Sequence, residues 1–152
     1  MNPFLHGFGK LLAPIYESPL WFPIVIKLLG GWNAPTIKDN IKFIRETMAP
    51  VKGLVLDVAT GTGINGRHIA GPQRAVYGVD ISVEMLRKAQ KYMQRDRIQK
   101  MFLARADGDA LPFGDAVFDG CLLCGCLHIF PDTRKKPCWR LAVRLNPALR
   151  FL

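Results

Sequence analysis

Acidic residues are scarce in this chain of 152 residues, in which 12 Asp and Glu stand against 21 Lys and Arg, for a formal net charge of +9. Such an excess is typical of proteins that bind nucleic acid or anionic membranes. However, six of the positive charges lie in residues 134–152, which contain no acid, and no nucleic-acid-binding motif accompanies them. We therefore expect no nucleic-acid partner.

Cysteine is also rare, with four residues at Cys121, Cys124, Cys126 and Cys138. They do not form the dense pattern of a disulfide scaffold, so we expect a reducing, cytoplasmic compartment. The first three form C-x2-C-x-C, a pattern that metal sites also use, but a partner pair is missing and His128 is the only imidazole nearby. We interpret them as small apolar residues in and just after a buried strand, and we predict no metal.

The chain lacks an apolar run of the roughly 20 residues that a membrane-spanning helix needs, and it lacks a signal-peptide pattern. Residues 1–34 are nevertheless rich in apolar and aromatic side chains, with Pro19, Pro23 and Lys27 as interruptions. Two interpretations stay open for this segment. It is either a helical lid over a ligand pocket, with Tyr16 as a candidate catalytic residue over the substrate, or a peripheral contact with a membrane surface.

Hydrophobic periodicity predicts alternating helices and strands in the rest of the chain. An amphipathic helix is expected over 35–48, with a buried face made of Ile37, Ile41, Ile44 and Met48. Short apolar runs predict strands at 54–59, 75–80, 101–107 and 117–124. Helices should follow the first two strands, and the second of these should be capped by Ser82 and bury Val83, Leu86, Ala89 and Met93. This order is typical of an α/β, doubly wound, Rossmann-like fold, with a mostly parallel sheet and helices on both faces.

The stretch LDVATGTGING (56–66) joins the first predicted strand to a helix and holds Gly61, Gly63 and Gly66 in the G-x-G-x-x-G spacing of dinucleotide sites. Asp80, at the end of the second strand, suits a ribose. The charge of Asp57 does not suit a dinucleotide, because it would repel the pyrophosphate. S-adenosylmethionine (SAM) also has a ribose and an adenine, but it carries sulfonium and ammonium cations and no phosphate. We therefore predict SAM as the ligand, with a nicotinamide cofactor of an NAD(P)-dependent oxidoreductase as the alternative.

The same stretch begins a resemblance to a known family. LDVATGTG resembles the first motif of class I SAM-dependent methyltransferases, in particular the methyltransferase type 11 group that includes the ubiquinone/menaquinone C-methyltransferases. VYGVDISVEMLRKAQ is similar to that group's second strand and helix, and RADGDALPFGDAVFDGCLLCGCLHIFPD to its third and fourth motifs. The resemblance covers residues 35–136. It implies transfer of a methyl group from SAM to a small-molecule acceptor of quinone or lipid-like type.

The resemblance also implies roles for individual residues. Asp57 and the backbone of Ala59, Gly61 and Gly63 would face the methionyl part of SAM, and Asp80 would accept hydrogen bonds from the ribose hydroxyls. Ile81 would pack on the adenine, Asp107 and Gly108 would bond to it, and Cys124 would lie near the methionyl ammonium. For Asp80 and Asp107 the alternative is a cap or a turn. His128 stands where the group often has a histidine, either as a general base or as a packing residue.

The resemblance ends at Lys136. The group's sheet has seven strands in the order 3-2-1-4-5-7-6, whereas this sequence supplies four, so we expect the C-terminal strands to be missing. We divide the chain into a lid segment (1–34), a SAM-binding half-domain (35–136) and an aberrant tail (137–152), for which a frameshift near codons 134–136 is one hypothesis. The fourth strand, within VFDGCLLCGC, would then be an apolar edge open to self-association. We expect impaired turnover, and a non-catalytic truncated product is a further alternative.

Overall fold

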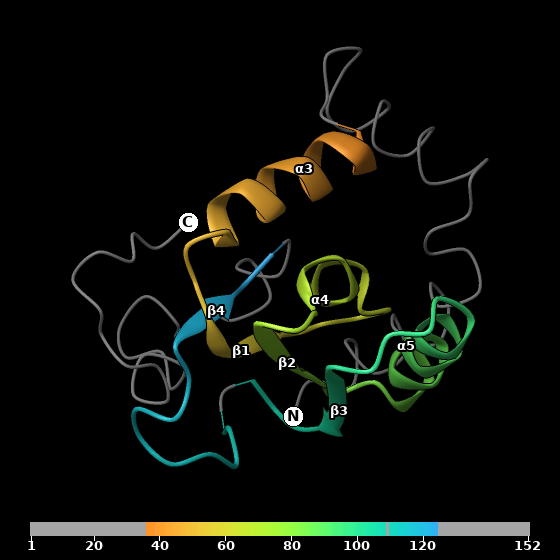
Figure 1. Cartoon of the computed structure of the whole chain (residues 1–152). Helices are drawn as coiled ribbons and strands as arrows, with labels where there is room; N and C mark the ends of the chain where they lie inside the picture. Colours follow the sequence, from red (N-terminus) through yellow and green to blue (C-terminus); the bar gives the residue numbers. More distant parts are fainter. Residues whose placement is uncertain (1–35, 109, 125–152) are drawn as a thin grey trace.

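The computed structural model describes residues 36–108 and 110–124. Within them, a parallel sheet with strand order β3-β2-β1-β4 carries three helices on one face (Figure 1). The strands are β1 (Gly53–Val58), β2 (Arg74–Asp80), β3 (Met101–Arg105) and β4 (Gly120–Leu122), and the helices are α3 (Ile37–Met48), α4 (Ile64–Ile69) and α5 (Val83–Arg95). The predicted Rossmann-like class and the predicted order of these four strands are confirmed.

The helix predicted at 35–48 forms as α3 and begins with a capping box. The Thr36 hydroxyl accepts a hydrogen bond from the Asp39 backbone N–H at 3.2 Å, and the Asp39 carboxylate accepts one from the Thr36 N–H at 2.9 Å. Reciprocal bonds of this kind satisfy two helix-terminal donors. The predicted apolar face is correct in part, since Ile44 and Met48 are buried, whereas Ile37 and Ile41 are only half-buried.

Helix α5 begins at the predicted cap, where the Ser82 hydroxyl accepts from the Met85 N–H at 3.3 Å. Its buried face differs in part from the prediction. Met85 and Ala89 are the fully buried residues, whereas Val83, Leu86 and Met93 are only half-buried. Residues 85 and 89 are four apart and therefore share the helix face that meets the sheet, and Met85 was missed because Leu86 is the stronger apolar signal.

The two outer strands are shorter than predicted. β3 ends at Arg105, and Asp107 forms an isolated bridge with Ala110. β4 covers only Gly120–Leu122, and Val117, predicted to lie in a buried strand, is 38% exposed. The neighbouring Ala116 has φ 56°, a left-handed conformation that extended strands exclude, so Val117 directly follows a turn.

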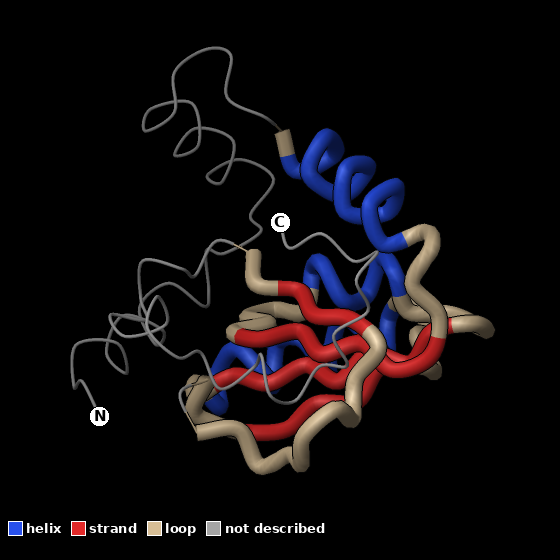
Figure 2. The backbone as a smooth tube through the Cα atoms, turned by 90° about the vertical axis from the view of Figure 1, so that its left-hand side faces the viewer, coloured by secondary structure: helices blue, strands red, loops and turns tan. Residues whose placement is uncertain are grey.

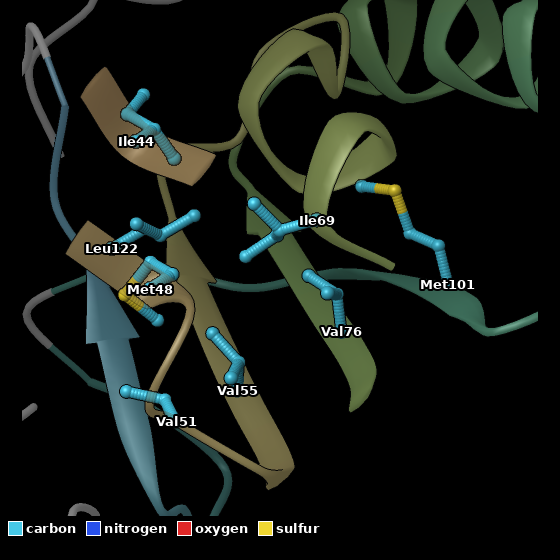
Figure 3. Packing of buried hydrophobic residues seen from close by; sticks show 8 residues of the cluster. All are labelled: Ile44, Met48, Val51, Val55, Ile69, Val76, Met101 and Leu122. Atoms are coloured by element: carbon cyan, nitrogen blue, oxygen red, sulfur yellow. The ribbon is translucent and has the colours of Figure 1, made fainter. Parts of the chain in front are cut away.

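The sheet separates two apolar clusters. On the helix side, Val55 and Val76 of the central strands pack with residues of the helices and of β3, as Figure 3 shows for Ile44, Met48, Ile69 and Met101. On the opposite side, the cluster consists of Leu56, Val58, Val79 and Phe118, with Leu111 and Phe113 packed against it. Figure 2 shows all three described helices on one side of the strands, so any helices on the second face, as predicted, lie outside the described residues.

Several predictions concern other parts of the chain. The lid segment (1–34) with Tyr16, the candidate base His128, and the tail (137–152) lie outside the described residues. Among the helices in the described ranges, none combines the length and apolar character that crossing a bilayer requires.

Candidate cofactor-binding site

The glycine loop, which we define as residues 59–63, follows β1 at the carboxyl edge of the sheet. Three of its residues have left-handed backbone conformations: Ala59 with φ 53°, Gly61 with φ 56° and Gly63 with φ 74°. Glycine adopts such angles freely, whereas an alanine there costs about 1 kcal/mol. The loop therefore holds a strained residue at its entrance, next to two glycines that turn the backbone without strain.

The two loop glycines differ in what surrounds them. A Cβ atom at Gly61 would meet no heavy atom within 4 Å, whereas one at Gly63 would lie 3.1 Å from the Met101 Cε and 3.4 Å from the Ala89 Cβ. Gly63 thus serves the packing of α4 against its neighbours. Gly61 presents bare backbone to open space, which is the side from which a ligand can approach.

Asp80 ends β2 directly beside this open side. One carboxylate oxygen accepts from the Gly61 backbone N–H at 2.8 Å and the other accepts from the Ser82 N–H at 2.8 Å. Burial raises the pKa of Asp80 above its ordinary value, and the backbone donors oppose that shift. Each carboxylate oxygen has lone pairs for more than one donor, so Asp80 retains acceptor capacity for a diol.

Asp57 lies beneath the loop and is only 2% exposed. Its Oδ2 accepts from the Thr60 hydroxyl at 2.6 Å, and the Gly66 backbone N–H also donates to the carboxylate. Burial raises the pKa of Asp57 to about 7, even though both donors favour the ionised form. The sequence analysis treated Asp57 as a fixed charge. In the structure its burial leaves it only partly ionised at neutral pH when no ligand is bound.

The residues predicted to surround an adenine follow β2 and β3. The Ala106 N–H donates to the Asp80 carbonyl at 3.1 Å, which brings the chain after β3 next to the end of β2. Ile81 is half-buried and Asp107 is exposed, with Gly108 half-buried beside it. Sequence reasoning missed Arg105, whose Nε donates to the Ile81 carbonyl at 3.3 Å, because its partner is a backbone atom.

Cys124 follows β4 and lies near Asp57. Burial raises the pKa of its thiol to about 11, and the charge of Asp57 adds to the shift, so the thiol stays protonated at neutral pH. Cys121 lies in β4 and Cys124 just after it, and both thiols are half-buried. Over residues 36–108 and 110–124, no three His, Cys, Asp or Glu side chains lie close enough together to hold a metal ion.

Thr60 was also missed, although its spacing from Asp57 is a usable signal. A hydroxyl three residues after an acid in a tight loop is well placed to donate back to that acid, and Thr60 does so. The glycines and the acids are the stronger signals in this loop, which is why no role was predicted for Thr60.

We expect Gly66→Ala to destabilise the fold by about 2 kcal/mol, because a Cβ there has no room. It would lie 2.8 Å from the Met101 Cε, 2.9 Å from the Asp57 Oδ2 and 3.1 Å from the Val76 Cγ1. Thermal unfolding measures the effect. Gly71→Ala is the matched control, since a Cβ at Gly71 would meet nothing within 4 Å. Equal melting temperatures for the two variants would contradict the packing at Gly66.

Comparison with known proteins gives a family match and several relatives. The model of the methyltransferase domain family matches residues 55–147, which includes part of the predicted tail. A demethylmenaquinone methyltransferase of Tropheryma whipplei is 42% identical over 74 residues, covering 49% of this chain and 30% of the relative. An O-methyltransferase of Penicillium expansum is 30% identical over 103 residues, covering 60% of this chain and 37% of the relative. The chain thus spans about a third of the length of these curated relatives.

A solved structure shares the fold over more of the chain. The putative S-adenosyl-L-methionine-dependent methyltransferase of Methanococcus maripaludis superposes with a TM-score of 0.64, covering 90% of this chain and 57% of the other at 15% sequence identity. At this identity the likeness concerns the fold alone.

Proposed function

This chain belongs to the methyltransferase domain family of class I SAM-dependent enzymes, and we propose that its glycine loop binds SAM as the donor for methyl transfer to a small molecule. Methyl transfer to a small molecule is thus proposed as the reaction of the whole protein. The nine residues that the resemblance assigns to SAM, from Asp57 to Cys124, are part of it.

The observation that carries the proposal is the buried carboxylate of Asp57 beneath the open face of Gly61. A pyrophosphate over this loop would force Asp57 to stay protonated or to face a like charge in a site of low dielectric. A sulfonium or ammonium group would instead stabilise the ionised form. The site therefore favours a cationic ligand over a dinucleotide.

Each end of the site has a distinct task in this proposal. The free lone pairs of Asp80 accept hydrogen bonds from the ribose hydroxyls, and Ile81 packs on the adenine beside Asp107 and Gly108. The backbone of Gly61 lies along the methionyl chain. SAM supplies an electrophilic methyl group on a cationic sulfur, and the protein contributes chiefly by holding donor and acceptor in line.

The acceptor we propose is a small molecule of quinone or lipid-like type. One relative is named for demethylmenaquinone, a quinone, and another is named an O-methyltransferase; the first name supports the quinone class. Methyl incorporation from labelled SAM into demethylmenaquinone, compared with a simple phenol, tests this class.

Peripheral membrane contact through residues 1–34 and self-association through the β4 edge remain predictions, as does impaired turnover.

We expect the chain to bind S-adenosylhomocysteine (SAH) and SAM, and not NAD⁺, because only the first two place a cation near Asp57. Isothermal titration calorimetry measures binding directly and requires no acceptor. A rise in melting temperature with ligand concentration gives a second, independent readout. Binding of NAD⁺ without binding of SAH would contradict the proposal and favour an oxidoreductase.

A further inference from the structure

Thr60 uses all of its polar groups inside the glycine loop. Its backbone N–H donates to the Val79 carbonyl at 2.9 Å, and its own carbonyl accepts from the Gly63 N–H at 2.8 Å. Its hydroxyl donates to Asp57 at 2.6 Å. With only 6% of its surface exposed, Thr60 links the end of β1, the end of β2 and the start of α4.

The carboxylate of Asp57 connects the two ends of this turn. It accepts from the Thr60 hydroxyl at one end and from the Gly66 N–H in α4 at the other. Charge-assisted hydrogen bonds to a buried carboxylate are stronger and shorter than neutral ones. Asp57 therefore closes the loop from below, and the Thr60 hydroxyl is a side-chain donor to it.

Gly78 of β2 makes room for the Thr60 side chain. A Cβ atom at Gly78 would lie 2.9 Å from the Thr60 Oγ1 and 3.0 Å from its Cγ2. Since β-branched side chains have few rotamers, this close contact and the bond to Asp57 together fix the side chain. The next residue, Gly61, then has its N–H directed at Asp80.

We propose that Thr60 is a positioning residue for SAM: its hydroxyl, bonded to Asp57 and seated on Gly78, fixes the loop so that Gly61 and Asp80 are correctly arranged for the ligand. This inference rests on the proposed function and deepens it. Thr60 acts through Asp57 and Gly61 and does not itself touch the ligand.

The charged groups around Asp57 determine its pKa, and a change in that pKa is a way to detect the effect of the Thr60 hydroxyl. Asp80 of β2 raises the pKa of Asp57 by its like charge, and Cys124 after β4 is a neutral thiol. On α4, the buried Arg67 is paired with Asp96 at 2.8 Å. Against this background, loss of the Thr60 hydroxyl removes a donor that favours the ionised carboxylate, so the pKa of Asp57 should rise further.

We expect Thr60→Val to weaken SAM binding about tenfold at pH 7.5, because Val keeps the shape but leaves the buried carboxylate without its hydroxyl donor. Thr60→Ser, which keeps the hydroxyl, should stay within about threefold of the wild type. The pH at which SAM affinity reaches half of its plateau should move upward in Thr60→Val and remain unchanged in Thr60→Ser. Calorimetry from pH 5.5 to 7.5 measures both quantities.

The matched control is Thr36→Val. Thr36 also donates its hydroxyl to an aspartate three positions away, in this case three residues later, at 2.7 Å to Asp39, but this pair is exposed at the start of α3. Its loss should leave SAM affinity and its pH profile unchanged. If Thr60→Val does not fold, Thr60→Cys, with a weak donor of similar size, should show an intermediate loss and an upward shift in pH.

Two outcomes distinguish this inference from the proposed function. If the wild type binds SAM and the Thr60 variants bind it equally well with the same pH profile, the positioning role is wrong and the proposed function stands. If the folded wild type binds no SAM at any pH, the proposed function itself fails.

Discussion

Asp80→Ala should lower the affinity of the chain for SAM by about 100-fold, with a similar loss for SAH. Two charge-assisted hydrogen bonds to a ribose diol, each contributing about 1.5 kcal/mol or more, account for a loss of that size. The variant also removes the acceptor of the Gly61 N–H, so the loop is no longer held in place beside the ligand. Both effects lower the affinity for SAM.

The same substitution should cost little folding stability. Burial raises the pKa of Asp80, which means that its charge is disfavoured in the folded protein without ligand. Removing it relieves that penalty while it breaks the bonds to Gly61 and Ser82. The melting temperature without ligand should therefore change little, and the loss should appear in the ligand-induced shift.

Asp119→Ala is the control for this prediction. Asp119 also accepts a backbone hydrogen bond, from the Leu54 N–H at 2.9 Å, but Leu54 lies near the amino end of β1, opposite the loop. We expect it to lower stability and to leave SAM affinity unchanged in calorimetry. Equal affinities for Asp80→Ala and the wild type would show that Asp80 does not bind the ribose.

The sequence predicted the sheet well, because its signals are local. Short apolar runs that hold Asp57 near the end of one strand and Asp80 at the end of the next, together with a glycine loop between strand and helix, predict parallel strands and the edge at which a ligand binds. The helix cap at Ser82 depends on one side chain three residues from its partner. Patterns of this kind can be read without knowing the fold.

What the sequence did not predict depends on contacts between distant segments. β4 pairs with β1 only over Gly120–Leu122, and composition does not reveal where that pairing starts. The space for Thr60 is made by Gly78, eighteen positions later on another strand. The protonation of Asp57 follows from complete burial, which the sequence analysis had no means to assess. The assignments of Tyr16 and His128 stay predictions.

The pH dependence of stability should reveal the buried carboxyl of Asp57. Its pKa is raised from 3.8 to about 7 in the folded protein, so between these values the folded state binds more protons than the unfolded state. Stability contributed by this group is therefore present at low pH and is lost as pH rises through 7. Relative to Asp57→Asn, the free energy of unfolding should fall by about 4 kcal/mol from pH 4 to pH 8.

The comparison with Asp57→Asn is needed because other groups titrate in the same range. The pKa of His68 is lowered by burial, which makes stability rise with pH, the opposite sign. Asp80 adds a slope of the same sign as Asp57. Since His68 is present in both proteins, its effect cancels in the difference, which urea unfolding at each pH measures. Asp80 is coupled to Asp57 by their like charges, so part of its slope remains in the difference, with the same sign as the slope of Asp57.

Ligand binding should show the reverse dependence on pH. A cation near Asp57 favours the ionised carboxylate, so SAM affinity should rise from pH 5.5 to 7.5 and binding should release a proton, most visibly below pH 7. SAH lacks the sulfonium charge and should show a weaker rise, and Asp57→Asn should abolish most of the difference between the two ligands. Calorimetry in buffers of different ionisation enthalpy counts the released protons. Identical pH profiles for the wild type and Asp57→Asn would mean that Asp57 only holds the loop and that its charge does not select the ligand.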